Sequence, residues 1–255
     1  MNFKLFSRHG NLTIMFAVLK KEVRQYFSGL LGYMTIAVFL FITGLVLFVL
    51  PETGILDLGY ASMESFFSSA PYIMLILIPG ITMKSFSDEY KSGTFEVLRT
   101  APIKIKQLVW GKYLASLVVV LVALLLTLVY VFSLVSLSTA GVDTGSIIGS
   151  YIGLFLLCAV YAAIGVYTSS LQKNAVTAFM SSALICYLVF SVFSSLAALD
   201  ILSFTAGYYL SLLGIEQHYQ SISKGYIDSR DFIYFISMVL LFLQMTLFRI
   251  KNHKP

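Results

Sequence analysis

Long apolar segments separated by short polar ones dominate the chain. A helix needs about 17 to 25 apolar residues to cross a hydrocarbon core about 30 Å thick, and six stretches free of Asp, Glu, Lys, Arg and His reach that length. We therefore predict an all-α integral membrane protein with a single transmembrane domain over residues 1–255. The predicted spans cover about 30–50, 67–84, 112–137, 146–171, 174–197 and 231–249.

The composition agrees with this pattern. Hydrophobic residues make up 58% of the chain and charged residues only 11%, against about 25% charged residues in a soluble domain. So few polar side chains cannot cover a water-soluble globule, which excludes the soluble, disordered and disulfide-rich classes. Cys158 and Cys186 lie within apolar stretches, where cysteine is typically a small buried hydrophobe.

The basic residues predict how the spans are oriented. With six crossings, fifteen of the 17 Lys and Arg residues fall on one side, and two, Lys224 and Arg230, fall on the other. By the positive-inside rule the first side is cytoplasmic, so both termini are cytoplasmic and the number of crossings is even. The net charge of +5 therefore indicates an orientation in the membrane and no nucleic-acid partner.

The spans lack the side chains that intramembrane chemistry requires. No ionisable group lies inside the apolar stretches, which disfavours an ion-coupled carrier. The phosphate-loop pattern is absent, because Gly111-Lys112 is followed by Tyr113 instead of Ser or Thr. A nucleophilic dyad at membrane depth is excluded because every histidine falls outside the spans. These are His9, His218 and His253. We expect no enzymatic activity, no metal and no bound cofactor.

Two cytoplasmic segments carry the remaining information, and the first precedes span one. Apolar residues recur there at helical spacing with cations on the other side, which predicts a helix over about 13–27 lying in the membrane interface. Gly29 and Gly32 offer a place to turn into span one. The alternative is a simple N-terminal extension of that span. The apolar positions are Phe16, Leu19, Val23 and Tyr26, and the basic ones are Lys20, Lys21 and Arg24.

The second segment is the long charged loop between spans two and three. Gly93 breaks the chain, Thr94 is a candidate N-cap, and Glu96 lies near the positive end of a short helix. On that helix Phe95 and Leu98 share a face at i and i+3, which predicts an apolar knob that projects toward the groove of another protein. The alternative is a solvated tether whose lysines only orient the chain.

Three segments carry a resemblance to a known family. They are VLKKEVRQYF before span one, MKSFSDEYKSGTFEVLRTAPIKIKQLVWGK after span two, and HYQSISKGYIDSRDFIYF before span six. The sequence resembles the permease subunits of type-2 ATP-binding-cassette (ABC) transporters, and most closely the gliding-motility-associated ABC permeases of Bacteroidetes. With matching hydropathy between these segments, the resemblance covers nearly the whole chain.

The resemblance implies a permease with an N-terminal interfacial elbow helix and a coupling helix that seats in a separate ATPase. ATP and Mg would then be bound by that ATPase and not by this chain. The elbow residues would be the seven positions given above for the segment before span one. The ATPase-coupling residues would be Asp88, Glu89, Gly93, Thr94, Phe95, Glu96, Leu98 and Pro102.

The resemblance also implies features of the assembly. Residues 201–215 would form a re-entrant segment between spans five and six, although an external amphipathic loop remains the alternative. The translocation pathway would run between two permeases, the second being a companion subunit or another copy. Small residues could let helices pack closely across or within the subunit. These are Ala162, Ala163 and Gly165 in span four and Ser181, Ser182 and Ala183 in span five.

These features predict the permease subunit of an ATP-driven exporter in a bacterial inner membrane, with gliding motility as the process that the resemblance implies. A different class of function is a membrane anchor for a motility or secretion machine, which would use the same loop for docking without transport. An ion-coupled secondary carrier is the third candidate, and the empty spans disfavour it. No feature of the sequence identifies the substrate or the direction of transport.

Overall fold

The computed structural model describes residues 3–50, 62–100, 103–138, 143–197, 205, 212, 214–225 and 228–252, and these residues form helices and no strands. Among the described residues, five helices are long and apolar enough to cross a membrane: Glu64–Lys91, Ile105–Ser136, Thr144–Leu171, Ala175–Ala197 and Ser229–Asn252. A sixth candidate is the pair Ile14–Ser28 and Gly32–Phe48, which meet at 65°. The prediction of an all-helical chain with long apolar helices is confirmed, with five to six candidate spans.

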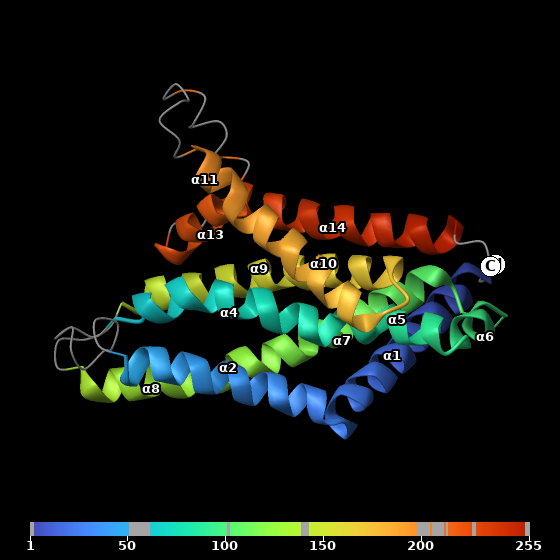
Figure 1. Cartoon of the computed structure of the whole chain (residues 1–255), viewed down its shortest axis with the longest axis horizontal. Helices are drawn as coiled ribbons and strands as arrows, with labels where there is room; N and C mark the ends of the chain where they lie inside the picture. Colours follow the sequence, from blue (N-terminus) through green and yellow to red (C-terminus); the bar gives the residue numbers. More distant parts are fainter. Residues whose placement is uncertain are drawn as a thin grey trace.

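The helices follow one another in the order shown in Figure 1. The first half contains α1 (Phe3–Ser28), α2 (Leu30–Phe48), α4 (Glu64–Thr82), α5 (Lys84–Lys91), α6 (Thr94–Thr100), α7 (Ile105–Leu126) and α8 (Leu128–Leu137). The second half contains α9 (Thr144–Leu171), α10 (Ala175–Tyr187), the π-helical turn η1 (Leu188–Val192), α11 (Phe193–Ala197), α13 (Ile215–Ser223) and α14 (Ser229–Asn252).

Helix α9 is the centre of the bundle. It packs against α4, α7, α10, α13 and α14. In its most apolar window 72% of the residues are buried, whereas the figure is 22% for the span that contains α10. Asp143 caps α9 by accepting hydrogen bonds from the N–H groups of Gly145 and Ser146, at 3.1 and 3.2 Å, as an N-cap carboxylate does.

Small residues of α9 bring its neighbours close. Gly165 faces Thr82 of α4, and a Cβ atom at residue 165 would clash with the Thr82 side chain. Ala162 and Ala163 are fully buried beside it. These small residues therefore pack within the subunit, which decides between the two arrangements that the sequence allowed for span four.

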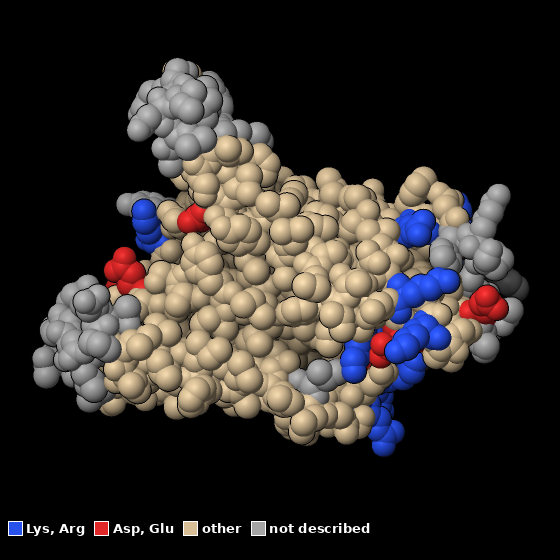
Figure 2. Space-filling model, in the orientation of Figure 1, with Lys and Arg blue, Asp and Glu red and all other residues tan. Residues whose placement is uncertain are grey.

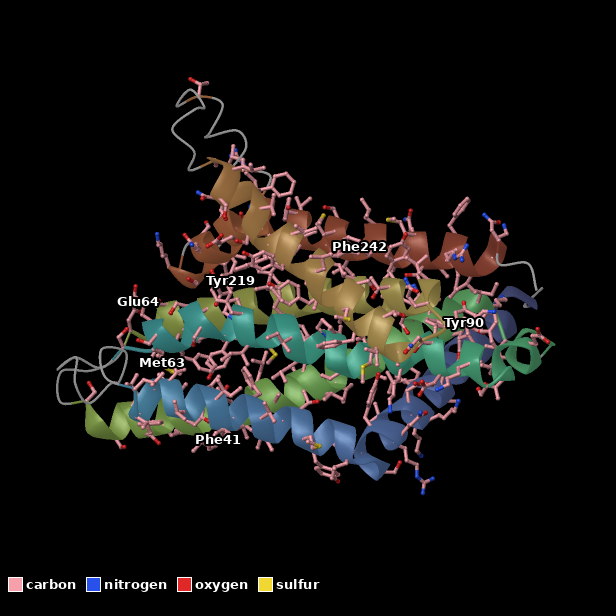
Figure 3. The ribbon with its side chains drawn as sticks, in the orientation of Figure 1. Phe41, Met63, Glu64, Tyr90, Tyr219 and Phe242 are labelled. Atoms are coloured by element: carbon pink, nitrogen blue, oxygen red, sulfur yellow. The ribbon has the colours of Figure 1, made fainter. Side chains whose placement is uncertain are left out.

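A proline inside α4 fixes the position of α13. Pro71 has no N–H group, so the carbonyl of Phe67 one turn earlier loses its helical partner. The hydroxyl of Tyr219 in α13 donates to that carbonyl at 2.6 Å, and Tyr219 is buried. This bond links α13 to α4 near Glu64, at the end of the molecule opposite Tyr90 (Figure 3).

The two ends of the bundle differ in charge. The beginning of α1, the end of α14 and the helices α5 and α6 lie at one end, and α11 and α13 lie toward the other (Figure 1). On the face drawn in Figure 2, most Lys and Arg side chains gather at the end formed by α1, α5 and α6. Most of the predicted re-entrant segment, residues 201–215, lies outside the described residues.

Candidate functional site

The predicted coupling residues lie on two short helices joined by a tight turn. Ser92 ends α5 with a backbone hydrogen bond to the Asp88 carbonyl at 2.9 Å. Gly93 then takes a φ of +71°, a left-handed conformation that favours glycine. The helix α6 begins at Thr94, whose hydroxyl lies 2.9 Å from that of Ser92. The break predicted at Gly93 is therefore present, while Pro102 lies outside the described residues.

The predicted apolar knob does not project from α6. Phe95 is 4% exposed and its ring packs edge-on against Tyr90 of α5, with centroids 4.6 Å apart. The i, i+3 pattern indicates the apolar side of a helix, but it cannot tell whether that side faces another protein or the chain's own core. In α6 it faces the core. Among the α6 side chains that the structure describes, those of Thr94 and Glu96 are exposed, and Leu98 is half-buried.

A buried ion-pair cluster joins this segment to two other helices. The Nζ atom of Lys112 in α7 lies 2.9 Å from Glu22 Oε1 in α1 and 2.7 Å from Glu89 Oε1 in α5. The Lys112 side chain is 2% exposed, and the ammonium lies 5.2 Å from the centre of the Phe86 ring. A buried ammonium without counter-charges would cost several kcal/mol. The two carboxylates therefore fix the relative positions of α1, α5 and α7.

The residue before Lys112 explains how α1 reaches this lysine. A Cβ atom on Gly111 would lie 2.7 Å from a methyl carbon of Val18 in α1, so glycine permits the close contact. Val18, Glu22 and Tyr26 repeat every four residues and form the buried face of α1. Sequence reasoning missed the pairing of Glu22 with Lys112. The available signal was the single carboxylate inside a run of cations before span one.

Helix α9 supports the start of α5. The residue before α5, Met83, offers no side-chain cap. Instead, the hydroxyl of Ser169 in α9 accepts hydrogen bonds from the N–H groups of Phe86 and Ser87, at 2.9 and 3.2 Å, and it donates to the Met83 carbonyl at 2.9 Å. Two of the N–H groups that a helix start leaves free are thus satisfied. This contact was also missed from the sequence.

The predicted elbow residues lie on α1, before its bend into α2. Phe16, Lys20, Lys21 and Arg24 are exposed, and Leu19 and Val23 are half-buried. Tyr26 differs from the expectation of a lipid-facing position, because it is 7% exposed and belongs to the protein core. Tyr26 is therefore not available to face lipid, because α1 uses it to pack against the bundle.

A cavity of about 380 Å³ separates these helices. Its walls come from α1, α5, α6 and α7, and they combine carboxylates and lysines with a few neutral side chains. The lining residues are Lys21, Glu22, Gln25, Lys84, Ser85, Asp88, Glu89, Ser92, Thr94, Leu98 and Lys112. Four of the predicted coupling residues, Asp88, Glu89, Thr94 and Leu98, thus meet at one cavity together with the ion-pair cluster.

The opposite end of the molecule holds a second polar region. A cavity of about 560 Å³ lies between α4, α9 and α13, and Glu64, Asp143 and Glu216 are among its lining residues. Nearby, His218 Nδ1 lies 2.6 Å from Asp231 Oδ1. Among the residues that the structure describes, no group of three or more His, Cys, Asp or Glu side chains is placed to hold a metal ion.

Comparison with known families decides what kind of protein this is. The model of the family described as ABC-2 family transporter protein matches residues 12–248. The chain belongs to the ABC-2 transporter family. A search of curated proteins found no match.

Membership of the ABC-2 family gives the apolar helices a role. The chain is a multi-pass membrane protein and a membrane permease of an ABC transporter. A permease of this family is a membrane component and not an ATPase, and the family implies an ABC ATPase partner in general. The matched residues include α5, α6 and all three members of the ion-pair cluster.

Proposed function

We propose that this chain is the membrane-spanning subunit of an ATP-driven exporter, in which α5 and α6 contact a separate ATPase. In this proposal α1 is the interfacial elbow helix, and ATP and Mg are bound only by the ATPase. The proposed location is a bacterial inner membrane with both termini in the cytoplasm. The resemblance to gliding-motility permeases supports a role of the complex in that process.

The bridge that Lys112 makes between Glu22 and Glu89 is the observation that carries this proposal. A force applied to the α5–α6 segment can drive transport only if that segment moves with the membrane helices. The carboxylate of Glu89 binds Lys112, two turns into α7, and the same lysine binds α1 through Glu22. A push on α5 is therefore transmitted to the apolar helix α7 and to the proposed elbow helix α1.

The exposed residues of α6 supply a contact surface. Glu96 and Thr94 face outward, while the buried Phe95 ring fixes the helix on α5. A charged side chain on a firmly packed helix suits recognition of a complementary surface, because little conformational entropy is lost when it binds. This placement supports Glu96 as an ATPase contact and Phe95 as the residue that holds it in place.

The test is to express the tagged chain in its own cells, purify it in mild detergent, and identify the ABC ATPase recovered with it. We expect Glu96→Lys to reduce the recovered ATPase at least about tenfold, because a reversed charge at an interface costs more than the roughly 1.4 kcal/mol of a tenfold change. Membrane insertion is expected to be unchanged. Glu64→Lys is the matched control, because Glu64 is an exposed carboxylate at the start of α4, far from α6.

The other classes of function predict different results from the same preparation. Recovery of structural components of a motility or secretion machine, with no ATPase, would favour the anchor. Substrate flux driven by an ion gradient without ATP would favour a secondary carrier. Full ATPase recovery and unchanged ATP hydrolysis in Glu96→Lys would contradict the assignment of α6 as the contact.

A second permease completes the proposed pathway, either as a companion subunit or as another copy of this chain. Apolar side chains on the outside of α10 support such pairing, because Val176, Met180 and Leu184 recur every four residues and are all exposed. The surrounding lipid bilayer covers whatever part of this stripe a second permease leaves free.

A further inference from the structure

An apolar groove with a basic rim lies beside the coupling segment. It encloses about 560 Å³ between α6, the start of α7 and the end of α14, at the end of the molecule where α6 and the last turns of α14 lie (Figure 1). We call it the lysine groove. The residues that line it are Phe95, Leu98, Ile103, Lys104, Ile105, Lys106, Leu108, Ile250 and Lys251.

The charges of the lysine groove are all of one sign. Lys104 and Lys106 stand on one wall, and Lys251 stands on the other. All three side chains are exposed, and no carboxylate is among the described residues that line the groove. None of the ion pairs found among the described residues uses these lysines. The groove therefore attracts an anion, while its apolar walls favour hydrocarbon.

The side chains around the groove are of the kinds typical of the lipid headgroup layer. Phe248 and Lys251 share a face of α14 at i and i+3, and Phe248 is 71% exposed. On α7, Trp110 follows Lys106 by one turn, and tryptophan is enriched where apolar spans meet the headgroup layer. Each wall thus changes from an exposed cation to an apolar or aromatic side chain within one helical turn, with Phe248 exposed and Trp110 half-buried.

We propose that the lysine groove binds an anionic phospholipid, with the phosphate between Lys104, Lys106 and Lys251 and an acyl chain passing along α14 beside Phe248. Basic pockets between membrane helices on the cytoplasmic side suit such headgroups. An acidic protein segment would pair with the lysines, but it would leave the adjoining apolar surface uncovered. An anionic phospholipid would contact both the basic rim and the apolar wall of the groove.

Occupancy of the groove also reaches the coupling segment. Phe95 and Leu98 of α6 form part of the wall, so a bound lipid packs against the same helix whose outer side carries Glu96. The lipid site itself does not depend on the proposed ATPase contact, because binding can be measured on this chain alone.

Native mass spectrometry of the purified full-length chain tests the proposal, with phosphatidylglycerol and phosphatidylcholine added separately to the detergent solution. We expect the wild-type chain to retain phosphatidylglycerol in preference to phosphatidylcholine. Replacing the three lysines by Gln is expected to weaken phosphatidylglycerol binding by roughly fivefold for each lysine, and so by about 100-fold in total. The triple Arg variant at the same positions is expected to bind as the wild type does.

The matched control removes three other exposed lysines at the same end of the bundle. The triple variant Lys84→Gln, Lys91→Gln and Lys173→Gln is expected to keep the wild-type preference, since these lysines do not line the groove. An equal loss in both Gln variants would show attraction by net charge alone and would overturn the site. Displacement of the lipid by an equal concentration of glycerol phosphate would overturn the role of the acyl chain.

Two further outcomes also decide the matter. If the groove variant keeps phosphatidylglycerol but no longer recovers the ATPase, the groove is a protein contact and the lipid proposal is wrong. If the groove variant loses lipid binding, and Glu96→Lys by itself still releases the ATPase, the lipid site and the proposed coupling contact are both supported as separate features.

Discussion

At the scale of single residues, Lys112 is the most deeply buried charged side chain that the structure describes. It is 2% exposed, it binds two carboxylates from helices distant in sequence, and it lies beside an aromatic ring. Removal of one partner from a buried ion pair leaves an uncompensated charge, which typically costs about 3 to 5 kcal/mol. Replacement of the lysine and both carboxylates by neutral side chains avoids that cost.

We therefore expect Lys112→Met to lower the thermal stability of the detergent-solubilised chain strongly, because Glu22 and Glu89 would lose the buried cation between them and only the exposed Lys21, 3.9 Å from Glu22, would remain. The triple variant Glu22→Gln, Lys112→Met and Glu89→Gln is expected to regain most of the lost stability. Thermal unfolding followed by circular dichroism measures both. Lys173→Met is the control, since that lysine is exposed. A triple variant as unstable as Lys112→Met would exclude uncompensated charge as the cause.

Each member of this cluster could be recognised in the sequence, but their contact in the folded chain could not be predicted. Lys112 was visible as a cation before an apolar span, and Glu22 as a carboxylate among cations. The two residues are 90 positions apart, and no local pattern specifies such a contact. The burial of Phe95 could not be predicted for the same reason. The helical face that carries Phe95 could be recognised from local sequence, but its contact with the Tyr90 ring could not.

At the scale of helices, apolar length was the reliable signal. The predicted spans overlap long helices because a membrane crossing is a local property of about 20 residues. Breaks inside the spans were not predicted. The chain passes through a π-helical turn at Leu188–Val192 and divides α7 from α8 at Thr127, whose hydroxyl lies 3.0 Å from that of Tyr151 in α9. The short α13 was missed because its stability depends on contacts with α4 and α9.

The contact between α9 and α5 is a prediction at this scale. Ser169→Ala removes the acceptor for the N–H groups of Phe86 and Ser87, so we expect a loss of about 1 kcal/mol, as for other helix caps. Amide hydrogen exchange in the first turn of α5 should become faster, by about fivefold for that free energy. Ser170→Ala is a matched control, because the hydroxyl of Ser170 donates to the Tyr167 carbonyl of its own helix. Equal exchange in the two variants would contradict a capping role for Ser169.

At the scale of the whole molecule, the charge distribution predicts the orientation in the membrane. The start of α1, the end of α14 and the α5–α6 segment lie at one end of the bundle (Figure 1), and the Lys and Arg side chains visible in Figure 2 gather mainly there. From the positive-inside rule we predict that this end is cytoplasmic. An ATPase in the cytoplasm can reach α6 only if this assignment is right, so the orientation decides the proposed function as a whole.

Cysteine labelling of intact cells measures the orientation directly. Ser92→Cys, in the turn between α5 and α6, is expected to react with a membrane-impermeant maleimide only in inverted vesicles. Lys224→Cys, exposed near the end of α13, is expected to react from outside intact cells. The native Cys158 and Cys186 are fully buried and give a low background. Labelling of Ser92→Cys from outside would place α6 beyond the reach of ATP, and no arrangement of the ion-pair cluster could then couple this chain to a cytoplasmic ATPase.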